Sequence, residues 1–294
     1  MDSFNSARLE IRVTNDFAFK RIFGQEDTKD ILAAFLSDVL GYPVSSDIEL
    51  ENTEVSPEYL RDKASRLDIT ARIRGVEKIN IEIQLVNEHN ISKRTLYYWS
   101  KYYARDLGEG QNYRELVKTV SIILIDYEVF KGDAKNYHNV FCALEKTRHE
   151  PFFDDFEIHV IELPKFLKLE KTNLTGLDGW MLFLERAGDE KTMAQVMEKK
   201  PIIRRAMNVA QMMERDKQER WLYEMREKGL KDIRSLEEHA REEGEHAGRI
   251  KTACAMLADA MSLDLISKFT GLPMEEIEAL HGHTLLPPEE SPQS

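Results

Sequence analysis

Residues 66–85, RLDITARIRGVEKINIEIQL, contain two runs in which apolar residues alternate with polar ones, joined by a short turn. A period of two is typical of β-strands with one buried face, so the pattern predicts a β-hairpin. One face of this hairpin carries the apolar side chains of Leu67, Ile69, Ile81 and Ile83. The other face carries Asp68, Glu82 and Gln84. The hairpin is therefore expected to hold two carboxylates and an amide close together.

The centre of the turn decides which of these groups face each other, because the numbers of facing residues in a hairpin add to a constant. A turn centred on Gly75 sets Asp68 opposite Glu82, and a turn centred on Val76 sets Asp68 opposite Gln84. In both registers the numbers of two facing residues add to an even constant, so all three polar side chains share one face of the hairpin. Facing Cβ atoms lie ~5 Å apart.

Two carboxylates at this separation repel each other and destabilise the hairpin unless a cation or a shared proton lies between them. Mg²⁺ meets this need, since it takes oxygen ligands, binds through one or two carboxylates and keeps several waters. A site open to water and to a phosphate oxygen supports metal-assisted hydrolysis of phosphodiesters. The alternative is a solvent-facing hairpin whose acids have no common role.

The charge of the chain limits how it can bind nucleic acid. A formal net charge of −12 over 294 residues argues against a protein that binds nucleic acid with its whole surface. Residues 61–105 depart from this average, with ten Lys/Arg against five Asp/Glu, a balance of +5. This local excess of positive charge is consistent with a cleft that faces a polyanion.

The two cysteines, Cys142 and Cys254, lie far apart and have no partner spacing, which argues against a disulfide framework and against a zinc ribbon. The first sixteen residues lack the pattern of a signal peptide. The longest apolar run of the predicted sheet, VSIILI at 120–125, is far below the ~20 residues of a membrane span. We expect a cytoplasmic protein.

The element order predicts a mixed α/β domain over residues 1–165, followed by a helical region over 166–284 that serves interaction or oligomerisation, and a disordered tail over 285–294. The predicted helices of the first domain cover 14–24, capped by Thr14 or Asn15, 28–41 and 88–110. Its predicted strands are 46–55, the hairpin, 118–127, 137–144 and 157–163. The strand at 118–127 is nearly unbroken by polar residues, as expected when both faces are covered.

Three segments carry a resemblance to a known family: NDFAFKRIFG at 15–24, RLDI with Asp68, and IEIQ with Glu82 and Gln84. They resemble the PD-(D/E)XK nuclease superfamily, and more narrowly the Rpn recombination-promoting nucleases, also called PD-(D/E)XK nuclease family transposases. The likeness covers about residues 12–165 and extends faintly into the C-terminal helices. It implies a restriction-endonuclease-like core, a central mixed sheet flanked by helices, with an all-α C-terminal region.

The resemblance also implies roles for the polar residues of the hairpin. Asp68 and Glu82 would bind the divalent ion, and Gln84 would contact the attacking water or the scissile phosphate. Asp16 would either add a ligand or act as an acid at a helix N-terminus. Mg²⁺ is the expected cofactor, with Mn²⁺ or Ca²⁺ as alternatives.

Two residues depart from the superfamily pattern. Leu67 replaces the usual proline, and Gln84 stands where the superfamily has a lysine, so the side chain at this position carries no positive charge to the phosphate. Lys63, Lys93 or Arg94 could supply that charge, and with Lys20 they are the candidate substrate contacts. For Lys20, Lys63 and Arg94, an ordinary surface charge is the preferred interpretation.

Two further segments allow more than one interpretation. The aromatic residues of the helix at 88–110 could pack against the sheet, which their helical spacing favours, or stack on unpaired bases: Tyr97, Tyr98, Trp99, Tyr102 and Tyr103. Residues 263–280 resemble a helix-turn-helix, but the second helix carries Glu275, Glu276 and Glu278 and no base. Protein–protein contact is therefore the preferred interpretation there.

Together these features predict a Mg²⁺-dependent DNA endonuclease. The resemblance implies a role in recombination, transposition or defence against mobile elements, a homodimer, and a small inhibitory protein partner. The main alternative is a nuclease-fold protein with weak activity that acts as an interaction or regulatory module through its C-terminal helices. A DNA-binding regulator is the other alternative, and the acidity of the chain argues against it.

Overall fold

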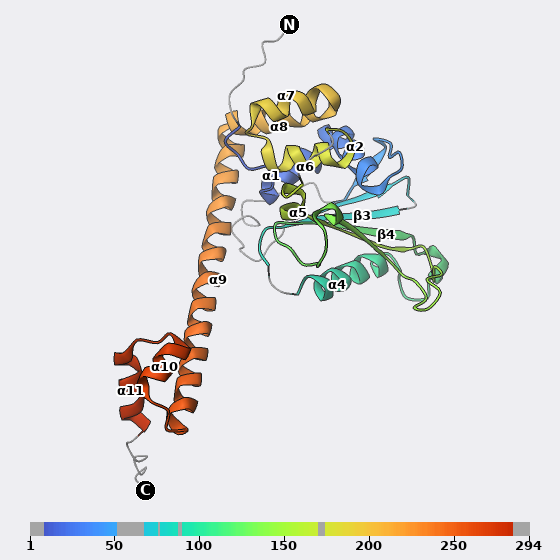
Figure 1. Cartoon of the computed structure of the whole chain (residues 1–294). Coiled ribbons are helices and arrows are strands. Elements are labelled where there is room, and N and C mark those ends of the chain that lie inside the picture. The colour runs from blue at the N-terminus through green and yellow to red at the C-terminus, as the bar shows by residue number, and fades with distance from the viewer. Residues whose placement is uncertain (1–8, 52–67, 76, 88–89, 170–173, 285–294) are drawn as a thin grey trace, which may run out of the picture. The chain divides into compact units, whose positions relative to one another are not determined.

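A computed structural model of the chain describes residues 9–51, 68–75, 77–87, 90–169 and 174–284. Its internal contacts form two compact units, Met1–Leu230 and Lys231–Ser294. The first unit contains one mixed six-stranded sheet with helices on both faces, and the second is helical (Figure 1). The α/β, PD-(D/E)XK-like fold expected from the sequence is confirmed.

The sheet has the strand order β1-β2-β3-β4-β6-β5. Strands β3 and β4 are parallel, as are β4 and β6, and the other three pairs are antiparallel. The predicted strands all appear among the described residues, with the bounds β1 Ile48–Leu50, β2 Ile69–Ile73, β3 Glu77–Gln84, β4 Lys118–Ile125, β5 His138–Cys142 and β6 Phe156–Glu162.

The β2–β3 hairpin is confirmed, and its register answers the question left open by the sequence. Ile69 pairs with Ile81 and Ile73 pairs with Glu77, which places Gly75 at the centre of the turn. Gly75 has a φ of +68°, a left-handed conformation that glycine adopts without strain. Continued by one residue, this register sets Asp68 opposite Glu82.

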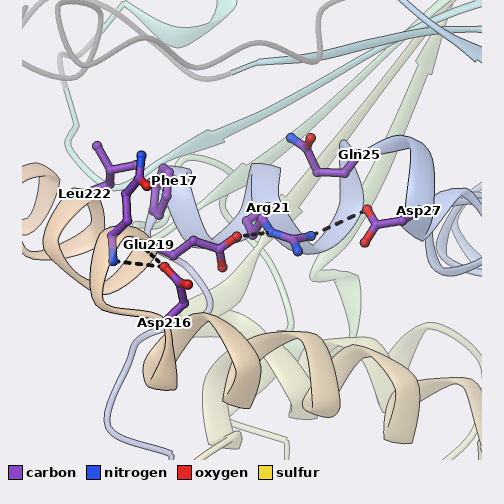
Figure 2. A pocket seen from close by; sticks show the side chains of 8 residues that line it. Phe17, Arg21, Gln25, Asp27, Asp216, Glu219 and Leu222 are labelled. Atoms are coloured by element: carbon purple, nitrogen blue, oxygen red, sulfur yellow. Dashed lines mark hydrogen bonds and ion pairs between the residues drawn. The ribbon is translucent and has the colours of Figure 1, made fainter.

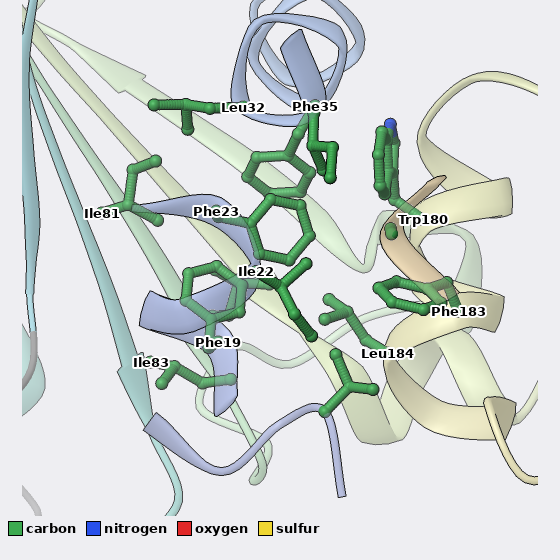
Figure 3. Close-up of a cluster of buried hydrophobic side chains, with 14 of the residues drawn as sticks. Phe19, Ile22, Phe23, Leu32, Phe35, Ile81, Ile83, Trp180, Phe183 and Leu184 are labelled. Carbon is green, nitrogen blue, oxygen red and sulfur yellow. The ribbon is translucent and has the colours of Figure 1, made fainter. Parts of the chain in front are cut away.

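Six helices, together with Tyr223 from the start of a seventh, pack with one face of the sheet into a single apolar core. They are α1 Asp16–Phe23, α2 Lys29–Leu40, α5 Leu163–Leu167, α6 Gly176–Arg186, α7 Glu190–Lys199 and α8 Ile202–Arg215. Figure 3 shows the aromatic centre of this core, where α1, α2 and α6 meet Ile81 and Ile83 of β3. In it, Phe23 lies with its ring centroid 5.1 Å from Phe35 and 5.5 Å from Trp180.

The boundary between the two compact units lies after Leu230, whereas the sequence predicts a domain boundary after residue 165. Helices α5 to α8 contribute buried residues to the same core as the sheet, among them Phe166, Phe183, Val196 and Ala206. The first compact unit therefore continues to Leu230. The expected disordered tail, 285–294, lies outside the described residues.

Helix α1 begins at the cap that the sequence predicts. The Asn15 side chain accepts hydrogen bonds from the backbone N–H groups of Phe17 at 3.0 Å and Ala18 at 3.3 Å. These bonds satisfy two of the donors that every helix leaves unpaired at its start. Asn15 rather than Thr14 is therefore the N-cap.

Helix α4, Ile91–Ala104, covers the opposite face of the sheet (Figure 1). Its Trp99 packs with Ile123 and Ile125 of β4 and donates a hydrogen bond to the Thr119 carbonyl at 2.8 Å. The ammonium group of buried Lys78, on β3, donates to the carbonyls of Tyr102 at 2.5 Å and Tyr103 at 3.0 Å. A cation at these last carbonyls stabilises the helix end and fixes α4 to β3.

Helix α9, Lys217–Ala258, has its first residues in the first unit and its later residues in the second. In the second unit, α10 Leu263–Thr270 and α11 Met274–Thr284 share a small apolar core with α9 around Ala253, Ile266 and Ile277. Short 3-10 helices occupy Glu26–Thr28, Tyr113–Glu115 and Ala134–Asn136. No helix in the described part of the chain is long and apolar enough to cross a membrane.

Two adjacent histidines on β5 and β6, the half-buried His138 and the buried His159, make stability depend on pH. His138 Nε2 lies 2.8 Å from His159 Nδ1, and burial together with the His159 charge lowers the pKa of His138 to about 4. Between about pH 4 and pH ~6.5, His138 is therefore neutral in the folded state, whereas the same histidine is protonated in the unfolded chain. Stability is complete above that pH and falls as the pH is lowered towards 4.

We expect this effect to cost about 2 kcal/mol of unfolding free energy between pH 7 and pH 5, at 1.36 kcal/mol per pH unit below 6.5. The fall should be smaller in His138→Gln and unchanged in the control His149→Asn, an exposed histidine of the same unit. Urea unfolding followed by tryptophan fluorescence measures it, since Trp99, Trp180 and Trp221 all lie in the first unit. An equal fall in His138→Gln would contradict this assignment.

Candidate functional site

The predicted acid pair lies at the end of the β2–β3 hairpin away from its turn. Asp68 directly precedes β2 and is half-buried, whereas Glu82 lies near the end of β3 and is buried. Lys78, Asn80, Glu82 and Gln84 alternate with the isoleucines that enter the main core, so they share the face of β3 that α4 covers. Extended by one residue beyond the start of β2, the register sets Asp68 opposite Glu82.

Glu82 and Gln84 belong to one hydrogen-bonded group. Gln84 Nε2 donates to Glu82 Oε1 at 3.0 Å, and Gln84 Oε1 accepts from the Tyr127 hydroxyl at 3.1 Å. Because both its donor and its acceptor are engaged, the amide of Gln84 has a fixed orientation. Tyr127 lies just beyond β4, and its role was not predicted from the sequence.

Arg94 provides a cation for this group from the first turn of α4. Its Nη2 forms an ion pair with Glu82 Oε1, and its side chain is only 9% exposed. The interpretation of Arg94 as an ordinary surface charge is therefore wrong. Lys93, the next candidate, is exposed, and Lys63 lies outside the described residues.

Lys20 is a second buried cation and comes from α1, on the other side of the sheet. Its residue is 1% exposed, and burial lowers the pKa of its ammonium group while the Asp68 charge opposes that shift. Lys20 thus interacts electrostatically with Asp68. The surface-charge interpretation is wrong for Lys20 as well.

The donor set suits a hard divalent cation. Asp68 and Glu82 supply carboxylate oxygens from adjacent strands, and Gln84 adds an amide group. Within the described ranges, no three His, Cys, Asp or Glu side chains gather into a group that could hold a metal ion. Two carboxylates would suit Mg²⁺, an ion that binds through one or two carboxylates and keeps several waters.

Asp16 has a different partner. Its carboxylate accepts hydrogen bonds from Arg226 of α9, from Nε at 3.0 Å to each oxygen and from Nη2 at 2.6 Å. Both side chains are buried, and both belong to the first unit. The structure therefore places Asp16 in an ion pair that attaches α1 to α9, and does not group it with Asp68 and Glu82. Arg226 lies 210 residues from Asp16, so no local sequence signal could have identified it.

A separate cleft of about 500 Å³ lies between α1 and the start of α9 (Figure 2). Arg21 crosses it and forms ion pairs with Glu219 at 2.8 Å and Asp27 at 3.6 Å. Neither Asp68 nor Glu82 lines this cleft. Its polar groups pair with one another and connect α1 to α9, which indicates a structural role.

We expect the Asp16–Arg226 pair to contribute stability and not metal binding. Arg226→Met leaves a buried carboxylate without its cation and should lower the unfolding free energy by about 3 kcal/mol. The double variant Asp16→Asn, Arg226→Met should recover most of that loss, measured by urea unfolding, and should bind Mn²⁺ as the parent does. Weakened Mn²⁺ binding in this stable double variant would instead show that Asp16 is a metal ligand.

Comparison with known proteins agrees with the fold. The sequence matches the family described as PD-(D/E)XK nuclease family transposase over residues 13–240, which include the whole β2–β3 hairpin and α4. The chain has no match among curated proteins or solved structures. Because the match covers more than half of its length, the chain belongs to the PD-(D/E)XK nuclease family transposases.

Proposed function

We propose that this protein is a metal-dependent DNA endonuclease that hydrolyses phosphodiester bonds at the Asp68–Glu82 pair. The observation that carries the proposal is the hairpin register, which sets Asp68 opposite Glu82 at the end of a central strand. Membership of a nuclease family supports the reaction class and DNA as substrate. The proposal adds to this reaction class a requirement for a divalent metal ion.

Asp68 and Glu82 would hold the ion, with Mg²⁺ as the expected species and Mn²⁺ as a substitute. When bound, such an ion polarises the scissile phosphate and lowers the pKa of a coordinated water. Burial of Glu82 strengthens its attraction for a cation, because charges interact more strongly where water is excluded. The ion pair with Arg94 offsets the negative charge of this buried carboxylate.

Gln84 would orient the attacking water or the phosphate. Its amide is held between Glu82 and Tyr127, so a group bound to it would meet a fixed donor or acceptor. Glutamine carries no charge, and the lysine usual at this position is absent. We assign the positive charge to Arg94 and Lys20, which approach the pair from α4 and α1.

The wider role remains a prediction from the family resemblance. Recombination or transposition fits the family description, and defence against mobile elements is the related alternative. A homodimer and a small inhibitory partner are further predictions of the same kind. The main functional alternative is a weakly active protein that acts through its C-terminal helices, and the nicking experiment below separates it from the endonuclease.

We expect the full chain to nick supercoiled plasmid in Mg²⁺, and Asp68→Asn and Glu82→Gln each to slow nicking by about 100-fold or more. The physical reason is the loss of an ion that stabilises the developing charge by several kcal/mol. Glu198→Gln, an exposed carboxylate on α7, removes the same charge and should nick like the parent.

Mn²⁺ binding, measured by electron paramagnetic resonance, should weaken in the two site variants and not in Glu198→Gln. Tryptophan fluorescence reports whether Glu82→Gln, which breaks a buried ion pair, remains folded. Nicking by Asp68→Asn at the rate of the parent would overturn the enzymatic proposal and favour the interaction module.

A further inference from the structure

The aromatic residues of α4 divide into two sets. Trp99 and Tyr102 are 7% and 8% exposed and pack towards the sheet, as their helical spacing predicts. Tyr97 and Tyr98 are 52% and 48% exposed. Packing against the sheet is therefore wrong for these two, and the neighbouring Leu96 is exposed as well.

The charge of α4 is unusual for this chain. Residues Ile91–Ala104 contain Lys93, Arg94 and Lys101 and no Asp or Glu, whereas the whole chain has a net charge of −12. Lys93 and Lys101 are exposed. The helix that covers the polar face of β3 thus presents positive charge to solvent.

The exposed cations and tyrosines alternate along one face of the helix. Lys93, Tyr97 and Lys101 follow at intervals of four residues, so they lie in one stripe about 12 Å long at 1.5 Å per residue. The Lys101 ammonium lies 4.7 Å from the centroid of the Tyr97 ring. Tyr97 and Tyr98 meet edge to face, with their centroids 5.3 Å apart.

Arg94 connects this stripe with the acid pair. Its guanidinium lies 5.5 Å from the centroid of the Tyr98 ring, and the same group forms the ion pair with Glu82. A strand that contacts Tyr97 and Tyr98 would therefore lie close to the carboxylates.

We propose that Lys93, Tyr97, Tyr98 and Lys101 bind unpaired nucleotides of the substrate. This inference rests on the proposed nuclease function and specifies its substrate: a nucleic acid with single-stranded character at the site. The tyrosines offer ring faces on which bases stack, and stacking requires bases that are not paired within a duplex. The two lysines attract the phosphates on either side.

A protein partner fits this surface less well. Tyrosine is common in protein interfaces, but lysine is depleted at their centres, and here two lysines flank the rings. Lysine next to aromatic residues is instead the pattern of single-strand binding surfaces. A second copy of the chain at this face is the competing occupant, and the experiment below distinguishes it.

The test measures binding of the full-length protein to a fluorescent 12-nucleotide single strand and to the duplex of the same sequence. EDTA is present, so that no metal-dependent cleavage occurs and binding is independent of turnover. Tyr97→Ala, Tyr98→Ala should weaken single-strand binding by about 10-fold or more, whereas Tyr97→Trp, Tyr98→Trp should retain it. Tyr113→Ala is the matched control, since Tyr113 is an exposed tyrosine of the same unit outside α4.

Lys93→Gln, Lys101→Gln should reduce the slope of log Kd against log salt by about 1 to 2. Unchanged single-strand binding in the double alanine variant, or an equal loss for single strand and duplex, would overturn the proposal. A change from dimer to monomer in that variant, with binding unaffected, would overturn it in favour of a second copy of the chain.

These outcomes are separable from failure of the nuclease proposal. If the parent protein binds single strands through Tyr97 and Tyr98 but does not nick DNA, the proposed binding surface is supported and the proposed nuclease reaction is wrong. If the parent nicks DNA and the double alanine variant binds and nicks like the parent, the proposed nuclease reaction is supported and the proposed binding surface is wrong.

Discussion

The pairing register of β2 and β3 is the constraint on which the candidate site depends. The β2–β3 register forces two carboxylates onto facing positions of neighbouring strands, and their repulsion has to be offset. Arg94 from α4 pairs with Glu82, and Lys20 from α1 lies near Asp68. Two helices on opposite faces of the sheet thus each bring one cation to the same strand ends.

Both helices are held by ion pairs or hydrogen bonds of their own. Lys78 fixes the C-terminal end of α4 to β3, and the Asp16–Arg226 pair fixes the start of α1 to α9. The first part of α9 therefore belongs to the first unit although it lies more than 130 residues after β3 in the chain. The family match likewise extends beyond the last strand, to residue 240.

Features that depend on local sequence could be predicted, and features that depend on tertiary contact could not. The hairpin, the Asn15 cap and the doubly covered strand β4 follow from alternation, capping chemistry and apolar runs. The burial of Lys20 and Arg94 depends on which helix face meets the sheet, as does the exposure of Tyr97. Asp16 illustrates the limit, because its partner Arg226 is 210 residues away.

The central claim is that Asp68 and Glu82 share one divalent ion, and a crystal soaked in Mn²⁺ tests it most directly through anomalous scattering. The account predicts one Mn²⁺ peak within coordination distance of an oxygen of each carboxylate, with waters completing the shell, and no such peak in Asp68→Asn. A crystal of the parent at saturating Mn²⁺ with no anomalous peak between the two carboxylates, and with Glu82 still paired with Arg94, would contradict it.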